Sequence, residues 1–268
     1  MSTPPAFTEI DPPSPLGRVA AVLRAAGRIL VHKDRYYDFN DLATIQDGVD
    51  GPAFQRAAQR MRTDPEGTRL LEDRIELNLR TIDWDRLSRL PVDTLGYNLW
   101  HHFFANDLFH EVVLAPPIIR WDPDTEYAKH RYRMTHDFRH VMLGLGTDPY
   151  EEVIVQTFQY AQLPQKLSLL IVLFGSVKHA LMDGKWRELR QGLPLAWRSG
   201  RKARFLSNTP FEDLLELPLA EVRERWGVEP VGTAYPVTER HPGAPWAPTW
   251  PDAQSGLTRR ISAATPAS

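Results

Sequence analysis

The chain has 268 residues, of which 42% are hydrophobic and 25% are charged, and its formal net charge at pH 7 is −2. These values are ordinary for a globular protein with a sizeable core, and no overall basic excess indicates a nucleic-acid partner. The sequence contains no cysteine, which excludes disulfides, thiolate metal sites and cysteine nucleophiles. Any metal ion must therefore be held by nitrogen and oxygen ligands.

Both flanks of the chain are rich in proline. Residues 1–15 contain no basic region followed by an apolar run, so we expect a flexible segment there and not a signal peptide. Residues 233–268 mix proline, glycine, serine and threonine with isolated tryptophans, which is typical of a disordered or loosely packed tail. The folded domain is expected to span residues 16–232.

Between these flanks, the apolar residues follow the three-and-four spacing of helices. In chain order, the pattern predicts helices over residues 16–30, 51–63, 66–73, 94–106, 124–143, 149–163, 166–190 and 211–226. No alternating strand pattern with hairpin turns appears. The sequence therefore predicts an all-α fold, a single multi-helix domain with a metal-binding helical hairpin at its centre.

The longest apolar run extends from Leu167 to Phe174. It is far shorter than the roughly 20 residues of a membrane-spanning helix, so we expect no transmembrane span and a protein that is soluble or lies on a membrane surface. The run would suit a core helix, a dimer face or the wall of a lipid groove, and a core helix is the preferred interpretation. A cluster of basic residues follows at Arg198, Arg201, Lys202 and Arg204. It is expected to be either a solvated helix face or a contact for anionic lipid head groups.

The clearest chemical signal is the pair of histidines in the segment from His136 to His140. Residues four apart lie on one helix face, so both imidazoles can point at one ion. Asp137 lies about 100° around the helix from His136, where it can bind the ion, act as a base or hold a ligand in place. Zinc peptidases have a glutamate at that position, and the shorter aspartate weakens a peptidase interpretation.

A further ligand is expected after the glycine-rich turn that ends this helix. Asp148 has the position of an N-cap, with Pro149 as the first helical residue. Glu151, three residues after Asp148, suits the capping box. Glu152 is then left to point back towards His140, so this reasoning selects Glu152 as the ligand.

Two histidines with one or two carboxylates suit one divalent ion. Zinc is the first choice, manganese, iron and cobalt are alternatives, and magnesium would need more water in its shell. A surface or core role for the histidine pair is the alternative to metal binding. His101 and His102 lie in an aromatic stretch, where we prefer a core or interface role.

The motif His136-Asp137-x-x-His140, followed after eleven residues by Glu152, resembles the signature of the coenzyme Q (ubiquinone) biosynthesis protein-four family. One departure is visible, because the family usually has glycine where this chain has Glu151. The resemblance extends over residues 16–232, through segments that match in order: Met61-Arg62, Pro65, Gly67, Arg69-Leu70-Leu71, Leu90-Pro91, Thr94-Leu95-Gly96, Tyr127, Arg131, Arg133, Gln162-Leu163-Pro164, residues 197–206 and residues 219–228.

The resemblance implies an all-helical protein, often a homodimer, with one divalent metal held by His136, Asp137, His140 and Glu152. It implies a role in ubiquinone biosynthesis, with a polyprenylated aromatic or isoprenoid lipid as ligand and other proteins of the pathway as partners. It also implies metal-dependent decarboxylation, in simple or oxidative form, at ring carbon one of a polyprenylated 4-hydroxybenzoate-type intermediate. For a bacterial relative the expected location is the cytoplasm, peripheral on the inner face of the membrane.

Three functional hypotheses follow from the sequence. The first is a metal-dependent decarboxylase, a carbon–carbon lyase in which Asp137 is the catalytic residue that shuttles a proton. The second is a non-catalytic prenyl-lipid-binding scaffold that organises the coenzyme Q biosynthetic complex. The third, a phosphohydrolase built on a His-Asp pair, needs a further histidine and aspartate that we do not identify.

Overall fold

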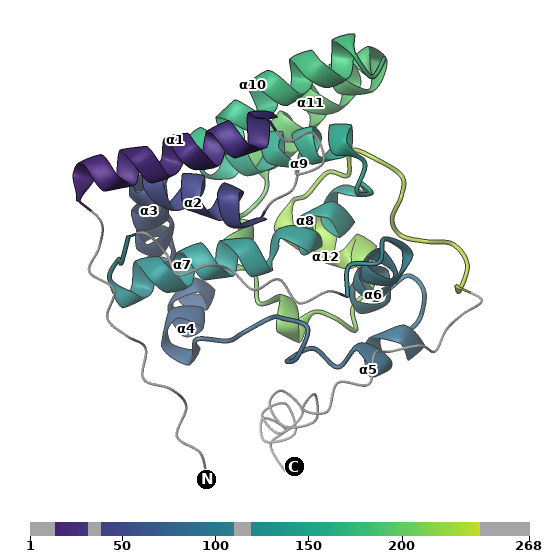
Figure 1. The fold of residues 1–268 in the computed structure, drawn as a ribbon. Helices are drawn as coiled ribbons and strands as arrows, with labels where there is room; N and C mark the ends of the chain where they lie inside the picture. The colour runs from purple at the N-terminus through teal and green to yellow at the C-terminus, as the bar shows by residue number, and fades with distance from the viewer. Residues whose placement is uncertain (1–13, 32–38, 110–118, 242–268) are drawn as a thin grey trace.

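The protein is entirely helical over the residues that its computed structural model describes, which are 14–31, 39–109 and 119–241 (Figure 1). An isolated bridge between Thr94 and Pro218 is the only strand-like pairing in these ranges. The elements, in chain order, are α1 Pro15–Val31, α2 Phe39–Val49, α3 Gly51–Arg62, α4 Pro65–Asp73, α5 Trp84–Arg89, α6 Leu95–Ala105, α7 Pro123–Met134, α8 His136–Leu143, α9 Pro149–Gln162, α10 Lys166–Leu181, α11 Trp186–Lys202, the short 3₁₀ helices Leu206–Asn208 and Phe211–Asp213, and α12 Leu219–Trp226. The all-α prediction is confirmed.

Two of the predicted long helices are each two helices. The predicted helix 124–143 breaks at Thr135, whose hydroxyl donates to the carbonyl of Arg131 at 2.7 Å. The buried Arg139 guanidinium then donates across the break to Tyr132 O at 2.9 Å and to Thr135 Oγ1 at 3.0 Å. The predicted helix 166–190 is broken by a turn in which Gly184 has φ +67°, a conformation that favours glycine.

Other boundaries also differ from the sequence-based ones. The sequence pattern did not predict α2, α5 or the second half of α11. In the predicted helix 211–226, the α-helix begins only at Leu219. The second half of α11 was missed because it contains Pro194. Proline normally ends a helix, whereas here the helix continues through it.

The core forms around α8 and α9, which occupy the middle of the molecule (Figure 1). Helix α8 buries Phe138, Val141, Met142 and Leu143 in the main hydrophobic cluster. Helix α9 packs against both α10 and α11, and the approach of α11 is close: a Cβ added to Gly200 would lie 2.7 Å from Phe158 O. Helix α8, which carries the histidines, contacts α6, α7 and α9 and is therefore held on several sides.

Helix α10 differs from the preferred sequence interpretation. Leu170, Leu173 and Phe174 are exposed, so the apolar run 167–174 is not a core helix throughout. None of the helices in the described ranges is both long and apolar enough to cross a bilayer.

The packed chain also continues past residue 232, where the sequence analysis ends the domain. Ala234 N donates to Gly144 O at 2.9 Å, and Val237 N donates to the Asn98 side chain at 2.8 Å. The ring of Tyr235 is buried in the main hydrophobic cluster. Residues 233–241 therefore pack on the core, whereas residues 242–268 of the expected tail, like residues 1–13 of the expected N-terminal segment, lie outside the described ranges.

Candidate metal centre

The α8–α9 hairpin is built as the sequence predicts. Helix α8 ends at Gly144, which has φ +72° and lets the chain reverse. Helix α9 starts with Asp148 as N-cap, Pro149 in the first turn and Glu151 in a capping box. The Glu151 side chain accepts from Asp148 N at 3.3 Å. Because Glu151 is used at the cap, Glu152 is the carboxylate that points across the hairpin.

Three of the four predicted ligands come together. His140 Nε2 lies 3.2 Å from His136 Nε2 and 3.1 Å from Glu152 Oε2, and His136 Nε2 lies 3.3 Å from the same carboxylate oxygen. One ligand atom from each of the three residues lies within 4.8 Å of the others, an arrangement that could hold a metal ion. His140 is 4% exposed, whereas His136 and Glu152 are 30% and 23% exposed, so the group opens to one side.

The contacts behind these ligands fit metal binding. His140 Nδ1 lies 2.7 Å from the carbonyl oxygen of Gly146. A carbonyl can only accept, so Nδ1 carries a proton, which leaves Nε2 as the His140 nitrogen that could bind a metal ion. Glu152 is held from behind as well, because its Oε1 accepts from Gln156 Nε2 at 2.7 Å. Ser168 of α10 donates in turn to Gln156 at 2.7 Å.

The charges of the group favour a cation. Burial lowers the pKa of His136, but the Glu152 carboxylate outweighs it and leaves that pKa above its ordinary value. Burial alone would raise the pKa of Glu152, and the two histidines instead hold it well below the ordinary value. Glu152 is therefore ionised, and a divalent ion would take the place of the proton that His136 otherwise keeps.

Asp137, the fourth predicted ligand, is not part of this compact group. Its Oδ1 lies 3.4 Å from His102 Nε2 of α6. Although burial raises the pKa of Asp137, the His102 contact and the nearby histidines lower it to about 2. The structure thus places an ionised carboxylate beside the group formed by His136, His140 and Glu152.

His102 is fully buried and has a polar role that its aromatic surroundings did not predict. Burial lowers its pKa, so the ring is neutral at pH 7. Its Nδ1 lies 3.0 Å from the hydroxyl of Tyr235. If Tyr235 donates there, His102 carries its proton at Nε2 and directs it at Asp137. Spacing could not reveal this contact, because Tyr235 is 133 residues away along the chain.

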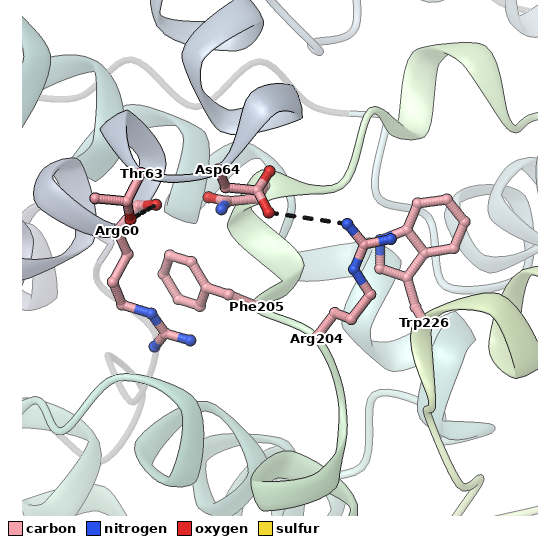
Figure 2. Close-up of a pocket in the computed structure, with 7 residues that line it drawn as sticks. Arg60, Thr63, Asp64, Arg204, Phe205 and Trp226 are labelled. Carbon is pink, nitrogen blue, oxygen red and sulfur yellow. Dashed lines mark hydrogen bonds and ion pairs between the residues drawn. The ribbon is translucent and has the colours of Figure 1, made fainter.

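A pocket is formed by residues other than His136, His140 and Glu152. It has a volume of about 310 Å³ and is lined by Arg60, Thr63, Asp64, Arg204, Phe205, Asn208 and Trp226 (Figure 2). Both arginines are already engaged: Arg60 lies 3.9 Å above the Phe205 ring and donates to Gln162 O at 2.6 Å. Arg204 stacks on Trp226 and faces Asp64 at 3.8 Å. This pocket therefore offers no free cation for an anionic ligand.

Comparison with known proteins shows the family of the chain. Residues 12–232 match the family model described as Coenzyme Q (ubiquinone) biosynthesis protein Coq4. The ubiquinone biosynthesis protein COQ4 homolog, mitochondrial, of Rattus norvegicus is 29% identical over 221 residues, which are 82% of this chain and 81% of that protein. The corresponding Homo sapiens protein is 26% identical over 224 residues, which are 84% and 83% of the two chains.

A solved structure supports the same relationship. The fold is similar to a crystal structure from Nostoc punctiforme that is named for ubiquinone biosynthesis, with a TM-score of 0.58 and 25% sequence identity. The similarity covers 79% of this chain and 97% of that one. Because the family model matches most of the chain and the fold agrees, the protein belongs to the Coq4 family of ubiquinone biosynthesis proteins.

Proposed function

We propose that this protein is a metal-dependent decarboxylase of ubiquinone biosynthesis, acting at ring carbon one of a polyprenylated 4-hydroxybenzoate-type intermediate. The observation that carries the proposal is the His136, His140 and Glu152 group with the ionised Asp137 beside it. Membership of the Coq4 family supports the pathway. The donor set of two imidazoles and a carboxylate supports one divalent ion, for which zinc is our first choice.

In the proposed reaction, the bond between ring carbon one and the carboxylate carbon breaks and carbon dioxide leaves. The electron pair stays on the ring carbon, which then takes a proton. A divalent ion held by His136, His140 and Glu152 would act as a Lewis acid towards oxygen atoms of the substrate. Asp137, which is ionised, is the proposed proton carrier: its carboxylate would take a proton from solvent and pass it to ring carbon one, and His102, with Nε2 3.4 Å from Asp137 Oδ1, would position it.

Metal analysis and turnover together test this proposal. The purified protein is expected to contain about one divalent ion per chain, and metal removal or His140→Ala is expected to abolish carbon dioxide release from a prenylated 4-hydroxybenzoate-type substrate. His130→Ala is the matched control, because His130 is half-exposed and pairs with Glu76 away from the group. Unchanged turnover after metal removal or in His140→Ala would contradict the proposal.

The oxidative form of the reaction replaces the carboxylate by a ring hydroxyl, which is a two-electron oxidation: water supplies the hydroxyl oxygen, carbon dioxide leaves, and dioxygen takes the two electrons and two protons to become hydrogen peroxide. Assays with and without oxygen separate the two forms. Carbon dioxide release without oxygen indicates simple decarboxylation, and release that depends on oxygen, with a hydroxylated product, indicates the oxidative form.

A non-catalytic scaffold that binds prenyl lipid is the second candidate, and the apolar side chains exposed on α1 and α10 favour it. In that case, the purified protein retains polyprenyl lipid, captures other enzymes of the pathway and turns nothing over. Mass spectrometry of bound lipid and light scattering, which reports whether the protein is a homodimer, test these features.

The proposed location follows from the proposed substrate. A polyprenyl lipid resides in a bilayer, so we place the protein peripherally at a membrane, on the cytoplasmic side in a bacterial cell. Relatives from animals carry the word mitochondrial in their names. Fractionation of cells, followed by a salt wash of the membranes, tests this location.

A further inference from the structure

Helix α10 has its apolar side chains outside. Its buried positions are Ser168 and His179, and Gly175 lies on the same side, where an added Cβ would meet Val153 of α9 at 2.6 Å. The opposite stripe is apolar and exposed, at the i, i+3, i+4, i+7 and i+11 spacing of one helix face: Leu170, Leu173, Phe174, Val177 and Leu181. Apolar side chains that stay exposed to water do not stabilise a monomer, so the stripe indicates a binding surface.

The exposure increases towards the tip of the α10–α11 hairpin, residues 166–202. Leu181, Met182 and Trp186 are 80%, 76% and 63% exposed. All exposed large hydrophobic side chains in the described ranges lie on this hairpin or on α1. In Figure 1, α10 and α11 project together from the upper edge of the molecule, so the apolar tip is prominent.

Basic side chains accompany the apolar ones. The hairpin contains eight lysines and arginines against two acidic residues, a net charge of +6 in a chain whose total is −2. Arg187 and Arg190 are exposed on the first two turns of α11, beside the apolar tip, and neither makes an ion pair with another described residue. Two features thus coincide, apolar side chains at the tip and uncompensated cations next to them.

This combination favours one occupant. In a two-fold dimer, the same face of each copy would meet, so two hairpins of charge +6 would repel each other. An anionic bilayer instead offers an apolar interior to the tip and negative head groups to the arginines. Tryptophan is favoured at the level of the head groups, and Trp186 and Trp197 are both exposed on α11.

We propose that the α10–α11 hairpin docks on an anionic lipid bilayer, with Leu181, Met182 and Trp186 inserted and Arg187 and Arg190 on the head groups. The inference deepens the peripheral location proposed above by naming the surface and the lipid charge that it recognises. It does not depend on the decarboxylase activity, because vesicles without a ubiquinone precursor are sufficient to test it.

Sedimentation with vesicles tests the docking surface, using the full chain. Vesicles of phosphatidylcholine with 30% phosphatidylglycerol are expected to bind the protein at least about tenfold better than phosphatidylcholine alone, and 0.5 M salt is expected to weaken binding. The variants Leu181→Ser with Met182→Ser, and Arg187→Gln with Arg190→Gln, are each expected to reduce binding about tenfold or more. The control Arg89→Gln with Arg225→Gln removes two exposed arginines elsewhere and is expected to bind like the wild type.

Several results would overturn the proposal. They are failure of the wild type to bind anionic vesicles, equal binding to neutral ones, or hairpin variants that bind like the control. Light scattering on the same samples measures the oligomeric state and so tests whether a second copy of the chain covers this surface. If the Leu181→Ser, Met182→Ser variant turns a dimer into a monomer while vesicle binding stays unchanged, the face belongs to another copy and the membrane proposal is wrong.

Discussion

At the scale of single residues, Gln159 controls how His136 can act. In the structure, Gln159 Nε2 lies 2.9 Å from His136 Nδ1, and Gln159 Oε1 accepts from the Tyr132 hydroxyl at 3.0 Å. A metal bound at His136 Nε2 requires a proton on Nδ1. The Gln159 amide would then have to rotate by 180°, so that its oxygen accepts from His136 Nδ1 and its nitrogen donates to the Tyr132 hydroxyl.

We therefore expect an acceptor at position 159 to be required for metal affinity. Gln159→Leu removes the acceptor and is expected to weaken metal binding by about 10- to 100-fold. Gln159→Glu keeps an oxygen there and is expected to retain most of the affinity. Competition with a chromophoric chelator measures both variants, after circular dichroism has verified that each is folded. Equal affinities of the two variants would contradict the prediction.

The titration of His136 gives a second prediction. Burial lowers the pKa of His136, but Glu152 raises it more, so the net shift is upward. A protonated imidazole cannot bind a metal. Metal affinity is thus expected to fall as the pH decreases through a pKa above the ordinary 6.5 of histidine.

Nuclear magnetic resonance titration of the metal-free protein measures this pKa directly. Glu152→Gln removes the carboxylate charge, leaves burial in place and is expected to lower the pKa of His136. A His136 pKa that does not respond to Glu152→Gln would show that another group protonates the site.

At the scale of helices, two glycines of α11 set its distance from α9. A Cβ on Gly200 would lie 2.7 Å from Phe158 O and 2.9 Å from Ala161 Cβ, neither of which can move freely. A Cβ on Gly192 would instead meet Ile154 Cδ1 at 2.5 Å, the far end of a flexible side chain. The two positions therefore differ in how well the neighbouring atoms can adjust.

Gly200→Ala is expected to lower the free energy of unfolding by about 1–3 kcal/mol, because the helices must separate. Gly192→Ala is expected to cost clearly less, because Ile154 can change its rotamer and alanine favours the helix. Urea unfolding of both variants measures the difference. A larger cost at Gly192 than at Gly200 would show that the α9–α11 contact is not limited by the backbone.

The helices also differ in how far the sequence could predict them. Apolar spacing predicted most of the helices, though not α2 and α5. The end of α8, helix α9 and the capping box at Asp148 were predicted because their signals are local. The break at Thr135 was missed because it depends on Arg139 bonding across it. His102, Gln159 and Tyr235 were missed at the site because their contacts join separate elements, which spacing along one helix does not reveal.

At the scale of the whole molecule, residues 233–241 connect distant helices. Arg223 of α12 donates to Val141 O of α8 and to Tyr235 O, both at 2.9 Å. Tyr235 then reaches His102 of α6 with its hydroxyl. One short segment near the end of the described chain thus joins α6, α8 and α12 behind the candidate metal site.

Substitution of Tyr235 tests this connection. Tyr235→Phe removes one hydrogen bond and is expected to reduce the free energy of unfolding by about 0.5–1.5 kcal/mol. Tyr235→Ala also removes the buried ring and is expected to cost about 3–5 kcal/mol. Glu239→Ala, at an exposed position in the same segment, is the control. Equal stability of Tyr235→Ala and the control, measured by urea unfolding, would mean that the segment contributes little.

The cap at the start of α9 has a consequence for how the motif can vary. Asp148 caps α9 and Glu152 lies in its first turn, where neighbouring helical residues differ by about 100° in direction. The number of residues between the cap and Glu152 therefore sets the direction of the Glu152 side chain. A change of composition in the turn before the cap leaves this direction unchanged, provided that Gly144 can hold its φ of +72°. An insertion or deletion between Asp148 and Glu152 would instead turn the Glu152 side chain by about 100° away from the histidines, so the spacing from the cap to Glu152 is a geometric requirement of the site.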